Sequence, residues 1–231
     1  SSIAREADRV VYTLAGPEIA VASTKAYTTQ LVALLMLSLY MGQILGTVSE
    51  DVIKEISSSL LSLPDKIEKI LEQKDRIEAI AESFKSVKDV FYIGRSIDYA
   101  IAMEGALKLK EISYIHAEAY AGGELKHGTL ALIVPETPVI AVATQDSVKY
   151  KMYSNIQEVK ARDAQVIGIG FDDDGELGKY VTETVCIPRV DRFTAPILSV
   201  IPMQLLAYYT GVKRGIDVDQ PRNLAKSVTV E

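Results

Sequence analysis

Strand-like and helix-like hydrophobic patterns alternate along the chain from about residue 88 onward. Continuous apolar runs of strand length occur at residues 89–93, 138–143, 165–170 and 184–187. Runs with the hydrophobic period of a helix separate or follow them, at residues 99–114, 147–162 and 197–214. Because strands that are apolar on both faces belong to covered parallel sheets, this alternation predicts an α/β fold with a doubly wound parallel sheet flanked by helices. Ligands of such sheets bind beyond the carboxyl ends of the strands.

The first 87 residues show a different, mostly helical pattern. Residues 9–14 are strand-like and lead into a turn signal that contains glycine and proline. Residues 23–41 are apolar around nearly the whole circumference of a helix, which is typical of a helix buried in a core. Residues 49–87 predict two amphipathic helices separated by Pro64, and we expect this pair to connect two structural units.

Composition narrows the classes of function. The 231 residues include 25 Lys and Arg against 31 Asp and Glu, so the net charge is -6 and the chain has no basic stripe for nucleic acid. The longest apolar stretch, residues 31–41, is shorter than the roughly 20 residues that a membrane span requires. One cysteine, Cys186, excludes an intrachain disulfide and favours a reducing, cytoplasmic location. With only two histidines the usual zinc sites cannot be assembled, so we expect neither a metal nor a cofactor.

Three charged residues share one face of the helix predicted over residues 99–114. Glu104, Lys108 and Glu111 are spaced by four and three residues, which places two carboxylates and one ammonium side by side. From the spacing alone, an exposed ladder of ion pairs is the simpler interpretation. The segment that follows, residues 113–128, favours a functional one, because it is dense in titratable and small residues.

His127 is the candidate acid–base group of that segment. It lies next to Lys126 and Glu124 in a run flanked by glycines, where the backbone can approach a ligand closely. His116 has only Glu118 as a titratable neighbour, and we interpret it as a structural histidine.

Two further segments contain candidate binding groups. The tail from Asp217 onward contains Pro221 and several apolar residues, so it could be an ordered segment laid over a pocket. Lys226 in this tail is a possible imine-forming amine, although the residues alone favour an ordinary solvated lysine. The junction at residues 21–25 offers N–H groups and hydroxyls at a helix start, which could receive a phosphate or a sugar hydroxyl or act only as a cap.

Four motifs together resemble one enzyme family. They are ASTKAYTTQ at residues 22–30, EGALKLKEISY at 104–114, GELKHG at 123–128 and DQPRNLAKSVTVE at 219–231. The combination is similar to the carboxyl-terminal part of the glucosamine-6-phosphate synthases, which are glutamine-dependent, isomerising fructose-6-phosphate aminotransferases. The resemblance covers the chain from end to end.

This resemblance implies catalytic roles for four residues. Glu111 matches the carboxylate that moves a proton between carbons 1 and 2 as fructosimine-6-phosphate becomes glucosamine-6-phosphate, and Lys108 matches its assisting neighbour. His127 matches a histidine that opens the sugar ring from the partner subunit of a homodimer. Lys226 matches a tail lysine that forms a Schiff base with the ketose. The implied substrate contacts are the backbone of Val21 and Ala225, with Ser23 beside them.

The same resemblance implies a domain organisation. Residues 1–47 match the end of a first sugar-isomerase (SIS) domain, residues 48–87 the connecting helices, residues 88–212 a second SIS domain with a flavodoxin-like three-layer fold, and residues 213–231 the terminal tail. The family's glutaminase domain, with its nucleophilic cysteine, and the phosphate-binding loops of the first SIS domain have no counterpart in these motifs. Candidate phosphate loops in the second domain are weak, because Asp146 would repel a phosphate and residues 94–96 offer one cation and one hydroxyl.

The leading hypothesis is therefore an isomerase fragment of an enzyme that converts fructose-6-phosphate and glutamine into glucosamine-6-phosphate and glutamate. Its expected partners are the sugar phosphate, the glutaminase domain and a second copy of the chain. Two alternatives stay open from the residues: a fructosamine-phosphate deglycase or isomerase of the same fold, and a noncatalytic SIS module that binds a sugar phosphate.

We predict negligible synthase activity for the 231-residue chain alone, because its motifs include neither the ammonia source nor the phosphate loops. The measurement is formation of glucosamine-6-phosphate from fructose-6-phosphate and glutamine by the purified chain. Turnover at the rate of a complete synthase would contradict the prediction.

Overall fold

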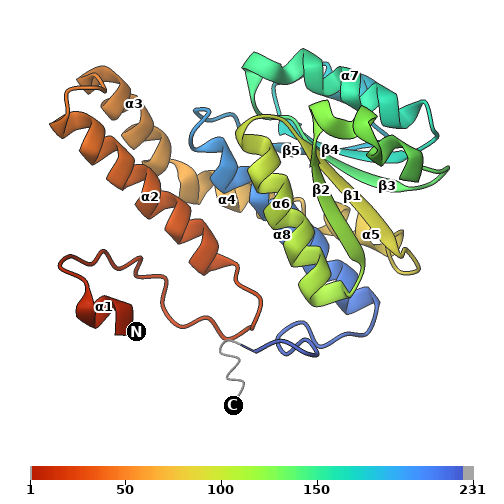
Figure 1. The fold of residues 1–231 in the computed structure, drawn as a ribbon, viewed down its shortest axis with the longest axis horizontal. Coiled ribbons are helices and arrows are strands. Elements are labelled where there is room, and N and C mark those ends of the chain that lie inside the picture. Colours follow the sequence, from red (N-terminus) through yellow and green to blue (C-terminus); the bar gives the residue numbers. More distant parts are fainter. Residues whose placement is uncertain (1, 226–231) are drawn as a thin grey trace.

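The computed structural model describes residues 2–225, and Figure 1 shows their arrangement. The helices and strands are α1 (Ser2–Glu6), α2 (Lys25–Ile44), α3 (Glu50–Leu61), α4 (Leu63–Leu71), α5 (Lys74–Glu82), β1 (Asp89–Gly94), α6 (Ile97–Ser113), β2 (His116–Ala121), β3 (Pro138–Val142), α7 (Lys149–Lys160), β4 (Gln165–Phe171), β5 (Glu183–Ile187) and α8 (Ala195–Lys213). Short 3-10 helices lie between them: η1 (Gly122–His127), η2 (Thr129–Leu132), η3 (Asp146–Val148) and η4 (Leu177–Lys179).

The five strands form one parallel sheet in the order β2-β1-β3-β4-β5. This is the flavodoxin-like order, and it confirms the predicted doubly wound α/β fold. The register of β1 and β2 shows which residues lie at the amino and carboxyl ends of the strands, called here the amino edge and the carboxyl edge of the sheet. Asp89 pairs with His116 at the amino edge, and Gly94 pairs with Ala121 at the carboxyl edge.

Helices cover both faces of the sheet, which gives three layers. On one face, α5, α6 and α8 pack against inward side chains such as Tyr92, Ile140 and Ile169. On the other face, α7 and the 3-10 segments pack against Ile93 and Val139. The strands are therefore buried on both sides, and this is why they read as continuous apolar runs.

The helix α8 is the central helix of the core. By length and composition it could cross a membrane, but 72% of its apolar window is buried inside the protein, as expected of a core helix. It packs closely on α6, where an added Cβ at Gly105 would lie 2.4 Å from the sulfur of Met203 and one at Gly211 would lie 2.6 Å from the Ile112 carbonyl oxygen. These two glycines allow the two helix backbones to approach each other.

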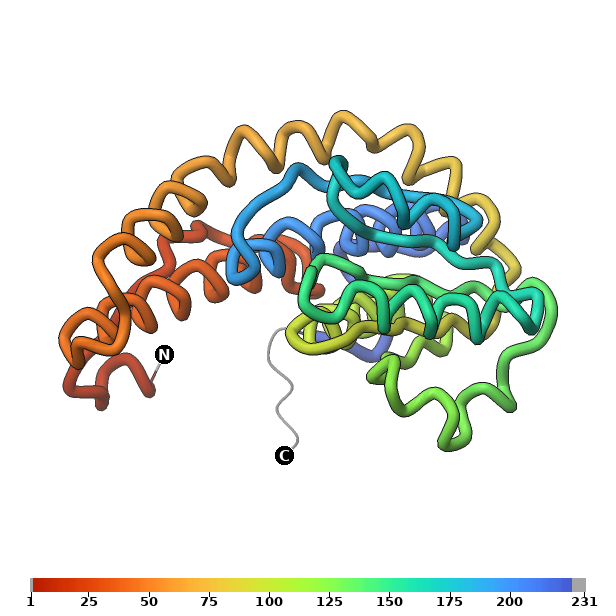
Figure 2. The backbone as a smooth tube through the Cα atoms, turned by 90° about the horizontal axis from the view of Figure 1, so that it is seen from above, coloured from red at the N-terminus to blue at the C-terminus, as the bar shows by residue number. Residues whose placement is uncertain are grey.

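The first part of the chain lies beside this domain. Figure 2 shows α3, α4 and α5 as an arch that leads from the α2 end of the molecule to β1. Ser49 caps the start of α3, where its hydroxyl accepts a hydrogen bond from the Val52 N–H at 3.5 Å. Pro64 lies in the first turn of α4, as predicted for a helix boundary.

Two local predictions were wrong, and one strand was missed. Residues 9–14 form no strand and are not part of the sheet, and Val11, Tyr12 and Leu14 are exposed. The second amphipathic helix of the connector is two helices, α4 and α5, which meet at Gln73. The hydrophobic pattern predicts no strand over residues 116–121, but they form the edge strand β2.

The helix predicted over residues 23–41 exists as α2, but its burial was predicted wrongly. Leu34, Met36 and Tyr40 are exposed, and only Leu39 and Gly42 are buried within the described residues. A helix that is apolar around its whole circumference is expected to be covered by other parts of a polypeptide, but the pattern does not identify the covering segment.

We predict that alanine substitutions at two helical leucines change the free energy of unfolding by very different amounts. Leu109→Ala in α6 should lower the free energy of unfolding by about 2–5 kcal/mol, because Leu109 is 0% exposed and the substitution leaves a cavity. Leu34→Ala in α2, where the leucine is 61% exposed, should change it by less than about 0.5 kcal/mol. Urea unfolding of the 231-residue chain measures both. A large loss for Leu34→Ala would mean that the α2 face is covered.

Candidate functional site

The helix α6 buries an ammonium group between two carboxylates. Lys108 Nζ lies 2.6 Å from Glu111 Oε2 and 3.5 Å from Glu104 Oε1. The exposed side-chain fractions are 4% for Lys108, 11% for Glu104 and 22% for Glu111. The predicted cluster therefore forms, but it is not an exposed ladder, because only Glu111 is appreciably open to solvent.

Glu104 is the buried acid of this cluster. Burial raises the pKa of Glu104, and the nearby Glu111 carboxylate raises it further, while the charge of Lys108 acts in the opposite direction. Its buried Oε1 atom makes no hydrogen bond to any residue within 2–225. A lysine between a buried acid of raised pKa and a second, more exposed acid forms an arrangement suited to proton transfer.

The first turn of α2 lies against this part of α6. Burial and the charge of Glu104 raise the pKa of Tyr27 to about 12. Gln204 of α8 donates to the Thr24 carbonyl oxygen at 3.4 Å, which ties the start of α2 to the core. Thus α2, although largely exposed along its length, contributes its amino-terminal turn to the surroundings of Glu104.

The junction before α2 is already occupied by an internal carboxylate. Glu18 accepts hydrogen bonds from the Thr24 N–H at 2.7 Å, the Thr24 hydroxyl at 3.0 Å and the Ser23 hydroxyl at 3.3 Å. Burial opposes ionisation, but these hydrogen bonds hold the pKa of Glu18 below its usual value. The donors that the sequence offered to a phosphate are therefore engaged by Glu18 in this structure.

The tail approaches both this junction and the end of α6. The Val21 N–H donates to the Asp219 carbonyl oxygen at 3.0 Å, and the Arg222 N–H donates to the Tyr114 hydroxyl at 2.7 Å. Figure 1 shows the tail passing below α6 and α8, next to the start of α2. Ala225 is exposed, and Lys226 lies outside the described residues.

His127 lies at the opposite edge of the sheet from Glu111. Glu111 belongs to the last turn of α6, which leads into the amino edge of β2, whereas His127 ends η1, which follows the carboxyl edge of β2. The His127 side chain is 75% exposed, with Glu124 Oε2 4.0 Å from its Nε2 atom. Because α6 is about 25 Å long at 1.5 Å per residue, one chain does not bring His127 to Glu111.

The strand order reverses between β1 and β3, which makes this place the switch point of the sheet. Another internal carboxylate lies there, at the carboxyl ends of the two strands. Asp98 accepts hydrogen bonds from the Thr144 N–H at 2.7 Å and the Thr144 hydroxyl at 2.5 Å. Burial raises the pKa of Asp98 against these hydrogen bonds and those from Gln145. Ligands of this fold bind in the crevice beyond the carboxyl ends of the strands, and here Asp98 engages the hydrogen-bond donors of Thr144 at that place.

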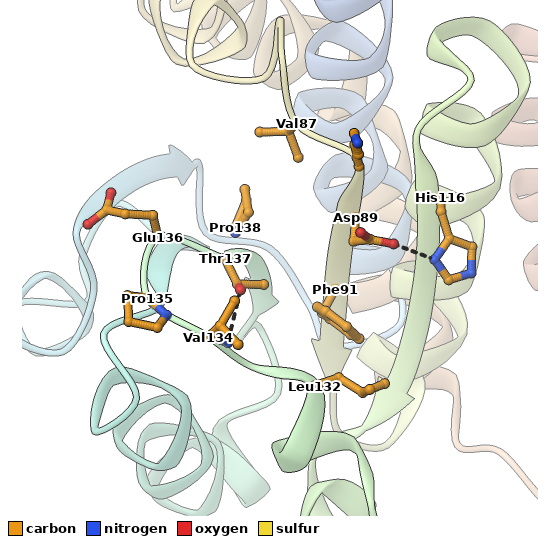
Figure 3. Close-up of a pocket in the computed structure, with 11 residues that line it drawn as sticks. Val87, Asp89, Phe91, His116, Leu132, Val134, Pro135, Glu136, Thr137 and Pro138 are labelled. Carbon is orange, nitrogen blue, oxygen red and sulfur yellow. Dashed lines mark hydrogen bonds and ion pairs between the residues drawn. The ribbon is translucent and has the colours of Figure 1, made fainter.

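A separate open cleft of about 470 Å³ lies on the α7 side of the sheet (Figure 3). It is lined by Phe91, Leu132 and the segment before β3, with His116 at its border. His116 Nδ1 is 2.9 Å from Asp89 Oδ1, in keeping with a structural role. None of the sequence-predicted site residues lines this cleft. Within residues 2–225 no three His, Cys, Asp or Glu side chains gather as metal ligands would.

Sequence reasoning missed Asp98 and Glu18. Both had a signal: each is an acid close to a predicted helix start, where free N–H groups attract negative charge. It also missed the contact between Tyr114 and Arg222, since these residues are 108 positions apart.

Comparison with known proteins gives one family. The SIS domain family model matches residues 1–40 and 83–214. The described β1–β5 sheet with α6, α7 and α8 falls within the second matched range.

Individual relatives match over the whole chain. The glutamine--fructose-6-phosphate aminotransferase [isomerizing] of Clostridium tetani is 55% identical over 231 residues, and that of Methanosarcina acetivorans is 51% identical. The chain spans 38% and 37% of their respective lengths. The C-terminal domain of glucosamine-fructose-6-phosphate aminotransferase from Francisella tularensis superposes with a TM-score of 0.92 at 41% identity, over 95% of this chain and 62% of that one. A glucosamine-6-phosphate deaminase from Thermotoga maritima, at 24% identity and a TM-score of 0.71, shares the fold.

We predict that Lys108→Met lowers the free energy of unfolding by on the order of 3 kcal/mol at pH 7, because it leaves Glu104 buried without its counter-charge. In the variant the charge of Lys108 no longer lowers the pKa of Glu104, so this pKa rises further above its value in the unfolded chain. Between those two pKa values the folded variant holds a proton that the unfolded chain has released, so its stability falls more than that of the wild type as pH rises through this interval. The loss in free energy of unfolding caused by Lys108→Met should therefore be smaller at pH 5 than at pH 8.

Urea unfolding at both pH values measures this effect. The matched control is Lys108→Met combined with Glu104→Gln, which removes the uncompensated charge and should recover much of the loss. A deficit that does not depend on pH would contradict the prediction.

Proposed function

Because the chain belongs to the SIS domain family, we propose that it is the sugar-isomerising part of a glutamine--fructose-6-phosphate aminotransferase. The observation that carries this proposal is identity of more than half over all 231 residues to relatives of that name. The glutamine-hydrolysing part would lie in the rest of such an enzyme, because the chain spans only 38% of these relatives. The proposed location is cytoplasmic, supported by the lone, unpaired Cys186.

The proposed reaction begins at the tail. The Lys226 amine adds to carbon 2 of the open-chain ketose and releases water, which leaves an imine. Ammonia then displaces the lysine and gives fructosimine-6-phosphate. Backbone groups at Val21 and Ala225 would hold the sugar, with Ser23 next to them. Val21 and the tail are already joined through the Asp219 carbonyl oxygen, which supports their sharing one binding region.

Glu111 is the proposed base of the isomerisation. Its carboxylate would take the proton from carbon 1 and return one to carbon 2, which converts the ketose derivative into the aldose glucosamine-6-phosphate. Support comes from its partial exposure, since it is the only acid of its cluster that a sugar could readily reach. Lys108 would fix the carboxylate through its 2.6 Å contact and stabilise the negative charge that develops as the imine becomes an enolamine.

His127 is proposed to act across a homodimer. A ring-opening histidine must contact the same sugar as Glu111, yet in one chain the two lie at opposite edges of the sheet. The contact between Lys126 Nζ and Glu158 Oε1, at 3.1 Å, ties η1 to α7, and His127 is left largely exposed. A second copy related by two-fold symmetry would supply its histidine to the first.

A noncatalytic sugar-phosphate module fits the cluster on α6 less well. Binding a neutral part of a sugar does not require an ammonium group buried between two acids, and such a group is costly to desolvate. The deglycase alternative has only fold-level support, from the deaminase at 24% identity.

Mixing two inactive variants of the complete enzyme tests the proposal. We expect Glu111→Gln and His127→Asn each to abolish isomerisation, and an equal mixture, dissociated and reassembled, to recover about a quarter of the wild-type activity. Half of the dimers are then hybrids, and each hybrid has one intact pair of Glu111 and His127.

His116→Asn, at an exposed histidine outside the site, is the control and should stay active. No recovery on mixing would show that His127 does not act across subunits. Full activity of Glu111→Gln alone would overturn the catalytic proposal.

A further inference from the structure

The short helix η1, which ends at His127, is connected to the sheet by a chain of polar side chains. Arg95, which follows β1, donates from Nε to Asn155 Oδ1 of α7 at 2.7 Å. Asn155 Nδ2 in turn donates to Glu158 Oε2 at 3.2 Å. The other oxygen of Glu158, Oε1, lies 3.1 Å from Lys126 Nζ. Lys126 comes directly before His127, so these contacts lead from the carboxyl end of β1 to the neighbour of the histidine.

Exposure increases toward η1 along this polar chain, which consists of Arg95, Asn155, Glu158 and Lys126. Asn155 is 5% exposed, whereas the exposed side-chain fractions of Glu158 and Lys126 are 20% and 67%. A buried amide requires partners at both of its ends, and Arg95 and Glu158 supply them. The Asn155 amide therefore fixes the Glu158 carboxylate, which contacts Lys126 through its other oxygen.

The backbone of η1 also lies directly against the polar chain. An added Cβ at Gly122 would lie 2.6 Å from Asn155 Oδ1, and one at Gly123 would lie 3.4 Å from Arg95 Nη2. A side chain at Gly122 would therefore force η1 away from Asn155. Leu125, which is 0% exposed, packs into the core on the α7 side and holds the middle of η1.

The contacts of the His127 side chain do little to hold it in place. The side chain is 75% exposed, and the distance from its Nε2 atom to Glu124 Oε2 is long, at 4.0 Å. Its position therefore depends on the backbone of η1, which Leu125 and Lys126 hold. Burial of Leu125 stabilises the fold, whereas an ion pair as exposed as that of Lys126 contributes little to stability. What this ion pair fixes is the orientation of the chain next to the histidine.

We propose that the polar chain positions His127 so that it can open the ring of a sugar bound to the partner subunit. This inference rests on the proposed function, because it takes His127 to act across a homodimer. In ring opening, the bond between carbon 2 and the ring oxygen breaks, and the histidine gives a proton to that oxygen. The 2-hydroxyl releases its proton to water and becomes a carbonyl, and water reprotonates the histidine.

A histidine that reaches into another subunit requires accurate support. A displacement of about 1 Å can lower the rate of a proton-transfer step by about a hundredfold. A side chain with few contacts of its own gains that accuracy from the segment that carries it. The members of the polar chain are positioning residues in this account and need not contact the sugar.

Two ketose phosphates, used with the complete enzyme, test this role. Fructose-6-phosphate closes its ring by adding the 5-hydroxyl to carbon 2, so it needs a ring-opening group. Its 5-deoxy analogue has no 5-hydroxyl, and its 6-oxygen carries the phosphate, so this ketose stays open. Turnover of the analogue with glutamine therefore requires the imine and isomerisation steps but not ring opening.

Variants of the polar chain should lose activity only with the ketose that has a ring. Glu158→Ala removes both contacts of the carboxylate and should lower kcat/KM for fructose-6-phosphate about tenfold. Its kcat/KM for the 5-deoxy analogue should stay within about twofold of the wild-type value, because the groups on α6 are unchanged. Lys126→Met should show the same selectivity, and Lys126→Arg, which keeps the ion pair, should retain most of the activity. His127→Asn calibrates the assay and should lose turnover of fructose-6-phosphate but not of the analogue.

Hydrogen exchange supplies a readout that does not depend on the sugar. The amides of residues 122–127 should exchange about fivefold faster in Glu158→Ala, the effect of losing one ordinary hydrogen bond. Lys179→Met breaks the exposed ion pair of Lys179 and Glu176 at η4, so it is the matched control and should change neither exchange nor turnover. The thermal midpoints of the variants and the wild type should agree, which separates positioning from general loss of stability.

The possible failures are distinguishable. If His127→Asn retains turnover of fructose-6-phosphate, the proposed function of this histidine is wrong and the positioning role falls with it. If His127→Asn loses that turnover but Glu158→Ala and Lys126→Met retain it, the role of the polar chain alone is overturned. Equal losses with both ketoses would also overturn it, because they indicate a general defect and not a misplaced histidine.

Discussion

The close approach of α6 and α8 is the contact on which the rest of the structure depends. Gly105 and Gly211 have no side chains, so Met203 and the Ile112 carbonyl oxygen can occupy the space that a Cβ would need. Larger residues at these positions would push α6 away from the core. Because α6 packs on β1 and β2 as well as on α8, its position sets the depth at which Lys108 is buried.

Three polar arrangements are distributed along this one helix. At its start, Asp98 accepts two hydrogen bonds from Thr144, at the carboxyl ends of β1 and β3. In its second half, Lys108 lies between Glu104 and Glu111. Beyond its last residue, the strained Tyr114 receives the tail. A rigid helix fixes the spacing of all three, so the acid–base groups and the tail anchor are held in one geometry before any ligand binds.

Two internal carboxylates engage hydrogen-bond donors of the kind that bind anions. Glu18 engages the donors before α2, and Asp98 engages those after β3. Both sites offer N–H groups and hydroxyls of the kind that bind phosphate, and in this structure both are satisfied by an acid of the chain itself. The described part of the chain thus combines acid–base groups with two sets of N–H and hydroxyl donors that its own acids engage.

The sequence by itself determined the parallel sheet, most helix positions and the composition of the Glu104, Lys108 and Glu111 cluster, because strand and helix periods and i, i+4 spacing are local properties. It did not reveal β2, whose alternating small and polar residues resemble a loop, or the exposure of α2, since a helix pattern does not say what covers it. The tertiary structure decided which edge of the sheet carries His127 and where the tail is anchored. These depend on chain direction in the fold and on contacts between residues as distant as Tyr114 and Arg222, which no local pattern records.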